Sequence, residues 1–416
     1  MRVLLVSANT ERLNAPTLPL GLSLVAAATE RAGHEVTYLD LLGEGSPCEA
    51  VRRACETSRP EVIGISVRNI DDQCMQAPQF LLEPVQEIVG ACRATTAAPI
   101  VLGGAGYSIF PGATLAYLGA DFGISGDGEV VFPALLECLA QHVAPWQLPG
   151  LHAPGRLPAA PRAIERDLDA LPLSGDELWA AADPGDKELW IPVQTRRGCP
   201  LECSYCSTAL VQGRSIRSRD PRRVVEFMAR AAGAGFRRFH FVDNTFNLPR
   251  SYALALCREI RAIGHELSWR CILYPHRIDD ELVKALEEAG CVEASLGFES
   301  GSEPILHLMN KRFDTEEVRA ISDRLAQAGI RRWGFLLLGG PGETVETIEE
   351  SLAFAASLRL DMLKVTAGIR IYPGTPLAAT ALREGLIEPG DDLLAPRFYV
   401  VPGLEGYLAK RLGEIS

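Results

Sequence analysis

Two series of short apolar segments, each followed by a predicted helix, run along this chain of 416 residues. In the first series, apolar runs predict five strands, at 3–6, 35–39, 62–67, 100–104 and 122–126. The stretches between and after them predict helices, at 20–32, 48–58, 79–93 and 129–141. Strands that alternate with helices in this way form parallel sheets whose two faces are covered by helices. We therefore expect residues 1–140 to fold as a doubly wound, five-stranded parallel sheet.

The second series begins after a proline-rich segment. Residues 141–190 lose the strand and helix periodicity and predict a linker, with room for a small hairpin. Beyond it, the candidate strands are 191–195, 239–243, 267–273, 293–298, 333–339 and 365–372. Six βα units suit a partial (β/α)6, TIM-like barrel better than a second flat sheet. The expected fold class is thus α/β, with the barrel at 191–375 and a short C-terminal extension at 376–416.

The composition restricts the partners of the protein. The formal net charge of -12 argues against general affinity for nucleic acid or for an anionic membrane surface. No apolar run approaches the roughly 18–20 residues that span a bilayer, and the first residues predict a strand rather than a signal peptide. The 11 cysteines, without a secretory signal, indicate a reducing cytoplasm in which thiols stay free or bind metal. We expect a cytoplasmic protein with no transmembrane segment and no nucleic-acid partner.

The most specific stretch of the chain is RRGCPLECSYCST, which contains a CxxxCxxC motif. Its cysteines, Cys199, Cys203 and Cys206, follow the first predicted barrel strand, and barrel enzymes place their chemistry at such strand ends. A zinc site would need a fourth ligand, and the closest histidine, His240, is far along the chain. Three thiolates suit a 4Fe–4S cluster with one iron left open. Free thiols, or zinc with a distant fourth ligand, remain alternatives at this point.

The motif resembles that of the radical SAM superfamily, with an aromatic residue, Tyr205, just before the last cysteine. In that family the three cysteines hold the cluster, and the open iron binds S-adenosylmethionine (SAM). The resemblance covers about residues 190–375, where further signatures follow in the family's order. It implies that SAM is bound by residues at the strand ends, namely Tyr205, Asp243, Asn244, Glu299, Lys311, Gly340 and Pro341.

By this resemblance, Asp243 and Asn244 contact the methionine amino group, and Glu299 holds the ribose hydroxyls. Lys311 pairs with the SAM carboxylate, and Gly340-Pro341-Gly342 shapes the adenine pocket. Three of these residues also have a plain structural interpretation. Glu299 could be a charge at a helix N-terminus, Asp243 a helix cap and Lys311 a solvated lysine. The order of the signatures after the cysteine motif favours the SAM site.

The first domain could bind a dinucleotide, act as a receiver module or bind cobalamin. No GxGxxG follows the first strand, and SANTERLN at its end holds one acid where a receiver has a cluster. Ser66 after the third strand and Gly103-Gly104 after the fourth resemble the flavodoxin-like domains of methionine synthase and of cobalamin-dependent radical SAM enzymes. Small residues there let the cobalamin tail approach the backbone. The residues implied in cobalamin binding are Ser66, Arg68, Asn69, Gly103, Gly104, Gly106, Gly126, Gly128 and Glu129.

One departure from that pattern concerns the lower face of the cobalt. The DxHxxG motif, which supplies a histidine ligand in methionine synthase, does not occur in this sequence. Bound cobalamin should therefore lack a histidine ligand. Arg68 ends the same strand as Ser66, and we expect its guanidinium near the vacant lower face, where positive charge favours an electron-rich cobalt. The alternative is a loop salt bridge from Arg68 to Asp71 or Asp72.

A cobalamin domain followed by a radical SAM barrel implies methyl transfer to an unactivated carbon of a small-molecule or lipid-type substrate. In the family, one SAM yields a 5′-deoxyadenosyl radical that activates the substrate, methylcobalamin supplies the methyl group, and a second SAM replaces it. An electron donor such as flavodoxin or ferredoxin is also implied.

Three other functions stay open at this point. Related enzymes use the same cofactors for cyclisation or rearrangement, and no residue here separates these outcomes from methylation. The intact cysteine triplet weighs against a non-catalytic cobalamin sensor. The acidic charge weighs against a methylthiotransferase that acts on RNA.

Overall fold

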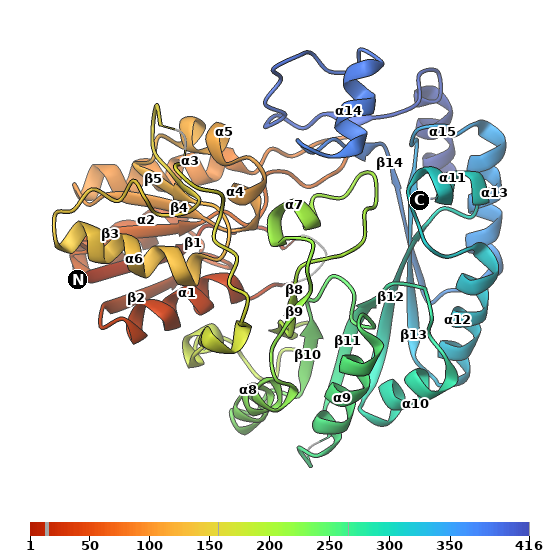
Figure 1. The fold of residues 1–416 in the computed structure, drawn as a ribbon, viewed down its shortest axis with the longest axis horizontal. Coiled ribbons are helices and arrows are strands. Elements are labelled where there is room, and N and C mark those ends of the chain that lie inside the picture. The colour runs from red at the N-terminus through yellow and green to blue at the C-terminus, as the bar shows by residue number, and fades with distance from the viewer. Residues whose placement is uncertain (13–15, 157, 265, 416) are drawn as a thin grey trace.

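The computed structural model, which describes residues 1–12, 16–156, 158–264 and 266–415, contains two parallel sheets flanked by helices (Figure 1). The first sheet has the strand order β2-β1-β3-β4-β5-β6. Its parallel strands are β1 (Arg2–Ser7), β2 (Glu35–Asp40), β3 (Val62–Ser66), β4 (Ile100–Gly103) and β5 (Phe122–Ile124). The order reverses between β1 and β3, as expected for a doubly wound sheet, and ligands bind such sheets at this point.

Helices cover both faces of this sheet because each strand is apolar on both sides. Leu4 and Val6 of β1 belong to one buried cluster, and Val3 and Leu5 belong to another on the opposite face. The helices are α1 (Leu20–Arg31), α2 (Pro47–Ser58), α3 (Leu82–Thr95), α4 (Ala105–Ile109), α5 (Pro111–Leu118) and α6 (Gly128–Ala140). Helix α3 begins later than predicted because Phe80 pairs with Asp71 in a β-bridge, which keeps the preceding residues extended.

The proline-rich segment contributes to the first domain. Within it, β6 (Leu151–His152) pairs antiparallel with β5, so the sheet has a sixth strand beyond the five predicted. Two short 3-10 turns follow, η1 (Leu168–Ala170) and η2 (Asp176–Leu178). The segment was predicted as a linker because one strand of two residues is too short to produce a periodic pattern.

The second sheet is a partial barrel whose strand order follows the chain, β14-β13-β12-β11-β10-β7, with every neighbouring pair parallel. The strands are β7 (Ile191–Val193), β10 (Arg238–Phe241), β11 (Ser268–Leu273), β12 (Cys291–Glu299), β13 (Arg331–Leu338) and β14 (Met362–Ala367). The outer helices are α8 (Pro221–Gly233), α9 (Arg250–Arg261), α10 (Asp280–Glu288), α12 (Thr315–Gln327) and α13 (Val345–Ser357). Figure 1 shows these helices outside the curved sheet.

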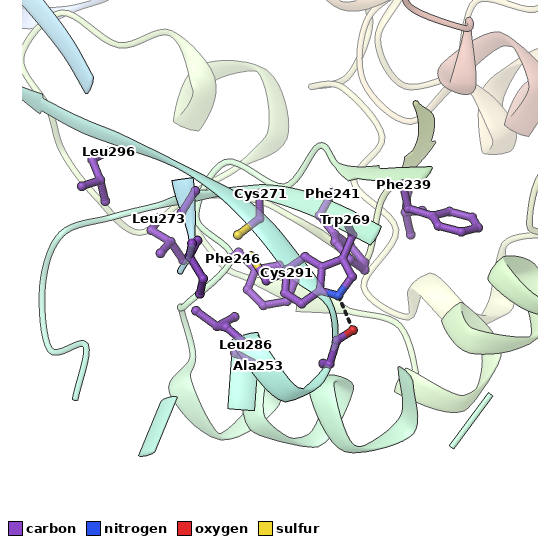
Figure 2. Close-up of a cluster of buried hydrophobic side chains, with 14 of the residues drawn as sticks. Phe239, Phe241, Phe246, Ala253, Trp269, Cys271, Leu273, Leu286, Cys291 and Leu296 are labelled. Carbon is purple, nitrogen blue, oxygen red and sulfur yellow. Dashed lines mark hydrogen bonds between the residues drawn. The ribbon is translucent and has the colours of Figure 1, made fainter. Parts of the chain in front are cut away.

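The core between this sheet and its helices is aromatic. Trp269 is 0% exposed, and its ring meets that of Phe241 edge-on at 5.1 Å between centroids. The indole Nε1 donates a hydrogen bond of 2.6 Å to the carbonyl of Ala289 (Figure 2). Because side chains alternate along a strand, His240 and Arg270 lie on the opposite, concave face, inside the barrel.

Shorter elements complete the chain around the carboxyl ends of the barrel strands. They are β8 (Arg196–Arg197), α7 (Thr208–Gln212), β9 (Arg217–Ser218), α11 (Glu303–Leu308), β15 (Ile369–Arg370), α14 (Pro376–Arg383), β16 (Phe398–Tyr399) and α15 (Glu405–Ile415). In the extension, β16 pairs with β15, and Tyr399 is buried with its hydroxyl donating to Glu384 at 2.7 Å. Among the helices of the described residues, none is long and apolar enough to cross a membrane.

Candidate active site

The three cysteines of the motif lie in the loop between β8 and α7. The loop is held from outside: the Cys199 amide donates to Gly213 at 3.0 Å, and the Ser204 amide donates to Met309 at 3.2 Å. Burial raises the pKa of the Cys199 and Cys203 thiols, and the charge of Lys311 opposes this rise. A thiol with a raised pKa needs a metal or a nearby cation to become a thiolate ligand.

The two metal interpretations of the thiols, zinc and a 4Fe–4S cluster, require different arrangements of ligands. Over the ranges that the structure describes, no group of three or more His, Cys, Asp or Glu side chains is placed to hold a metal ion. A zinc ion requires such convergence. In a 4Fe–4S cluster each thiolate binds a different iron atom, so the sulfurs surround a volume instead. The assignment of Cys199, Cys203 and Cys206 as cluster ligands rests on the spacing of their motif and stays a prediction.

Lys311 connects the predicted SAM residues to the cysteine loop. Its Nζ donates to the Tyr205 hydroxyl at 3.0 Å and to the Gly297 carbonyl at 3.3 Å, and lies 3.5 Å from Glu299 Oε1. The Lys311 side chain is 3% exposed, so the interpretation as a solvated lysine is wrong. Glu299 adopts φ +66°, a conformation that is uncommon outside glycine and found at ligand sites. These three side chains form one polar group beside the thiols.

Asp243, by contrast, has no acceptor position left open. Its Oδ1 accepts from the amides of Thr195 and Arg196 at 2.9 Å each, and its Oδ2 accepts from the Thr195 hydroxyl at 2.6 Å and faces the Arg196 guanidinium at 3.5 Å. A carboxylate has about four acceptor positions. The geometry thus gives Asp243 the role of tying β10 to the start of the cysteine loop, and not an open contact with the SAM amino group. Its neighbour Asn244 donates to Gln212 Oε1 at 2.9 Å.

The glycine-rich loop after β13 is organised by an acid that the sequence did not single out. The amides of Gly339 and Gly340 both donate to Glu343 Oε2, with the bond from Gly340 at 2.8 Å. Burial raises the Glu343 pKa to about 7, although the two amides lower it. The predicted residues Gly340 and Pro341 are therefore held in a tight turn by a buried carboxyl group.

A cavity of about 470 Å³ lies between the two domains. On the side of the first sheet, its wall contains seven of the nine predicted cobalamin residues: Ser66, Arg68, Gly103, Gly104, Gly126, Gly128 and Glu129. On the barrel side, the wall includes Pro192, Gln194, Arg197 and Val242. Asn69 lines a separate small cavity, and Gly106 packs against the backbone of Arg68. Among the described residues that line the cavity between the domains, none is a histidine.

Glycines let the backbone segments at this cavity wall pack closely against one another. A Cβ on Gly104, where φ is +101°, would lie 2.5 Å from the Val67 carbonyl oxygen. A Cβ on Gly126, where φ is +104°, would lie 2.5 Å from that of Ala163. The Gly103 backbone faces the cavity with space beside it. Glycine thus lets backbone line the wall directly, and this cradle fits the cobalamin tail expected from the sequence.

Arg68 has no hydrogen bond or ion pair with any residue that the structure describes. Its side chain is exposed and opens to the cavity, and partial desolvation by the surrounding protein lowers its pKa. The predicted loop salt bridge is absent because Asp71 binds Arg370 of β15 instead, at 2.8 Å, with both side chains 3% exposed. Asp72 accepts from the amides of Cys74 and Gln79. The guanidinium is therefore free to face a ligand.

A buried ionic network links the two domains at the other wall of the cavity. Arg197, two residues before the first cysteine, binds Asp127 at 2.8 Å and also Glu129. Arg217 of β9 binds the second oxygen of Asp127 at 2.7 Å. Glu129 is predicted from the sequence, whereas its partners are not, although the double arginine of RRGCP precedes the first cysteine. The turn that lines the cobalamin cavity is thus bonded directly to the cysteine loop.

Two family models match the chain in agreement with this geometry. The B12 binding domain matches residues 7–136, and the radical SAM superfamily matches residues 193–355. The protein therefore belongs to the cobalamin-dependent radical SAM enzymes, within a group that includes methyltransferases.

Individual relatives extend over most of the chain. The uncharacterized methyltransferase PH0819 of Pyrococcus horikoshii is 26% identical and covers 93% of this chain and 84% of the relative. Tryptophan 2-C-methyltransferase of Streptomyces laurentii is 24% identical, with coverage of 89% and 73%. The structure of the methyltransferase TsrM of Kitasatospora setae, with tryptophan and a SAM analogue bound, has a TM-score of 0.85 at 22% identity, with coverage of 98% and 87%. This last match shows the shared fold.

Proposed function

We propose that the protein methylates an unactivated carbon of a small polar molecule, with SAM bound beside a 4Fe–4S cluster and cobalamin in the cavity between the domains. When bound, the cluster with SAM supplies the radical that activates the carbon, and cobalamin supplies the methyl group. The observation that carries the proposal is the shared cavity. Its walls come from the cobalamin edge of the first sheet and from barrel residues that adjoin the cysteine loop.

The chain's own residues position both groups. Cys199, Cys203 and Cys206 hold the cluster, and Lys311 and Glu299 present a cation and an acceptor to SAM beside it. Arg68 stands in the cavity wall without a partner among the described residues, next to Ser66. If cobalamin is bound in the cavity, the positive charge of Arg68 would favour the electron-rich state of the metal.

The interior of the barrel favours a polar substrate over a lipid chain. Arg270 lies beside His240 in the strand register, and its Nη1 is 3.7 Å from Glu293 Oε1. Arg331, an exposed residue at the start of β13, binds the other oxygen of Glu293 at 3.0 Å, so the row of charges extends from the interior to the amino ends of the strands. An acyl chain placed against this row would remove water from charged groups without replacing its hydrogen bonds, which is costly. The tryptophan named for one relative is a polar molecule of suitable size.

The proposal is tested by anaerobic reconstitution with iron, sulfide and cobalamin, followed by addition of reductant and SAM carrying a deuterated methyl group. We expect about four irons and one cobalamin per chain, formation of 5′-deoxyadenosine, and transfer of the deuterated methyl group to cobalamin, read by mass spectrometry. The last readout needs no knowledge of the substrate, and a cyclase or rearrangement enzyme would not show it.

Two variants separate the sites. Cys203→Ala should remove the cluster and SAM cleavage while cobalamin binding persists. Gly103→Val, at a position where a side chain has space beside the cavity, should fill the cradle and remove cobalamin while the iron content persists. Retained SAM cleavage in Cys203→Ala, or binding of iron but no cobalamin by the unmodified chain, contradicts the proposal.

A further inference from the structure

Gln212 ends α7, the short helix that follows the three cysteines, and Figure 1 shows α7 between the two domains. Its Oε1 accepts a hydrogen bond of 3.1 Å from the amide of Gly198, the residue before the first cysteine. The carbonyl of the next residue, Gly213, accepts a bond of 3.0 Å from the Cys199 amide. The turn after α7 therefore folds back and holds the two residues at which the chain enters the cysteine loop.

The same side-chain oxygen of Gln212 has a second donor. Asn244, just after β10, donates to it from Nδ2 at 2.9 Å. The backbone carbonyl of Gln212 accepts from Arg217 Nη2 at 2.9 Å, and Arg217 also binds Asp127 of the first domain. Gln212 also lines the cavity between the domains. One residue thus contacts the cysteine loop, a residue predicted to bind SAM, and the junction of the two domains.

The orientation of both amide groups follows from the donor at Gly198. A backbone N–H can only donate, so Gln212 must present its oxygen to Gly198 rather than its NH2 group. Asn244 faces this oxygen and must therefore present its own NH2 group. The Asn244 carbonyl oxygen then points away from Gln212, and it accepts no hydrogen bond from any residue that the structure describes. An obligatory donor in the cysteine loop thus decides which way the acceptor of Asn244 faces.

The methionine amino group of SAM donates hydrogen bonds and needs an acceptor of this kind. Two residues are expected there from the sequence, Asp243 and Asn244. The oxygens of Asp243 are occupied by Thr195 and Arg196, so Asn244 is the one with an open acceptor. An Asn244 amide turned the other way would present NH2 to a donor, and no hydrogen bond would form. The contact therefore depends on the orientation that Gln212 imposes.

We propose that Gln212 is a positioning residue that holds the Asn244 carbonyl oxygen toward the amino group of SAM. The inference rests on the proposed function, since it assumes that SAM binds at the strand ends. Gln212 acts through Asn244, and no contact between Gln212 and SAM is required. Without Gln212, the Asn244 amide is free to rotate and to present either end to the ligand. Loss of one oriented hydrogen bond between neutral groups weakens binding about three- to tenfold.

The test measures SAM binding to the reconstituted chain without reductant, so that SAM is bound but not cleaved. Calorimetry compares SAM with an analogue in which hydrogen replaces the amino group. In Gln212→Met we expect the dissociation constant of SAM to rise about three- to tenfold, and that of the analogue to rise by less than about twofold. Gln212→Glu keeps an acceptor for both donors and should bind SAM within about twofold of the unmodified chain. Gln327→Met, at the exposed end of α12, is the matched control and should change neither constant.

Two further measurements locate the effect. In a double-mutant cycle, Gln212→Met should not weaken SAM binding further once Asn244→Leu has removed the carbonyl oxygen. In the unliganded chain, hydrogen exchange at the Gly198 amide should be faster in Gln212→Met and unchanged in Gln212→Glu, because exchange reports the bond that fixes the orientation. Circular dichroism checks that each variant is folded. Should Gln212→Met not fold, Gln212→Asn, whose shorter side chain loses at least one of the two donors, takes its place.

Three results would overturn the inference. Gln212→Met could bind SAM and the analogue as the unmodified chain does. It could weaken the binding of both ligands equally, which would mean that the substitution disturbs the cysteine loop as a whole. The effects of Gln212→Met and Asn244→Leu could add, which would mean that the two residues act independently. Failure of the proposed function is distinguishable, because SAM would then bind neither to the variants nor to the unmodified chain, whereas hydrogen exchange would still report the bond from Gly198 to Gln212.

Discussion

Arg68 and Arg197 line the same cavity from opposite domains, yet they are used in opposite ways. Arg197 is buried and fully engaged with two carboxylates of the other domain. Arg68 makes no hydrogen bond or ion pair with the part of the chain that is described, and it faces open space. A buried charge is tolerated only when it is paired, so Arg197 belongs to the structure of the junction. Arg68 is exposed to the cavity, where an unpaired charge can stay hydrated, and it is the one positioned to meet a ligand.

The largest expected effect on the free energy of unfolding comes from replacing Arg197, the paired arginine. Arg197→Met leaves Asp127 and Glu129 buried with less compensation, and we expect a loss of about 3–5 kcal/mol in the free energy of unfolding. Urea denaturation of the unliganded chain measures it. Arg197→Lys should recover part of the loss, because one ammonium cannot bind both carboxylates with the geometry of a guanidinium. A loss below about 1 kcal/mol would show that the network is solvated.

A smaller loss is expected at the second junction contact. Asp71→Asn removes the charge that faces Arg370, but the guanidinium keeps its bonds to the carbonyls of Ile371, Leu393 and Leu394. We expect about 1–3 kcal/mol, again by urea denaturation. An effect as large as that of Arg197→Met would mean that this pair, and not the network, dominates the junction.

Arg68 should behave in the opposite way. Arg68→Met is expected to change the free energy of unfolding by no more than about 0.5 kcal/mol, because no protein partner is lost. The absorption and paramagnetic resonance spectra of bound cobalamin should change instead, and Arg68→His should introduce nitrogen coupling on Co(II). Spectra identical to those of the unmodified chain would place Arg68 away from the metal.

The smallest expected effect links Arg68 to the barrel interior. Burial, Arg270 and Arg68 together lower the His240 pKa to about 3. Since the folded state disfavours the protonated ring, stability is lost as pH falls from about 6.5, the unfolded value, toward about 3. Arg68→Met should raise the His240 pKa, which nuclear magnetic resonance titration measures. His240→Gln should remove this part of the acid sensitivity. If the His240 titration is unchanged in Arg68→Met, the charge of Arg68 does not affect the His240 pKa.

Much of the site could be predicted because its signals are local in the chain. The three cysteines hold a fixed spacing, and glycines at the ends of β4 and β5 mark places where backbone must line a wall. For Asp243 and Lys311 the sequence predicts a position at a strand end but not their hydrogen-bond partners. The position of a residue in the chain does not show which groups the fold brings against its side chain. Asp243 is saturated within the protein, whereas Lys311 is buried beside the thiols.

The sequence by itself determined the two α/β domains and the motifs at their strand ends, because hydrophobic periodicity and residue spacing are local properties. Only the tertiary structure decided which charges are paired. Arg197 meets Asp127 and Arg370 meets Asp71, and the members of each pair are far apart in the chain. Such partners are chosen by the way the domains dock, and that docking also leaves Arg68 exposed to the cavity. The division between structural and ligand-facing arginines is therefore a property of the assembled junction.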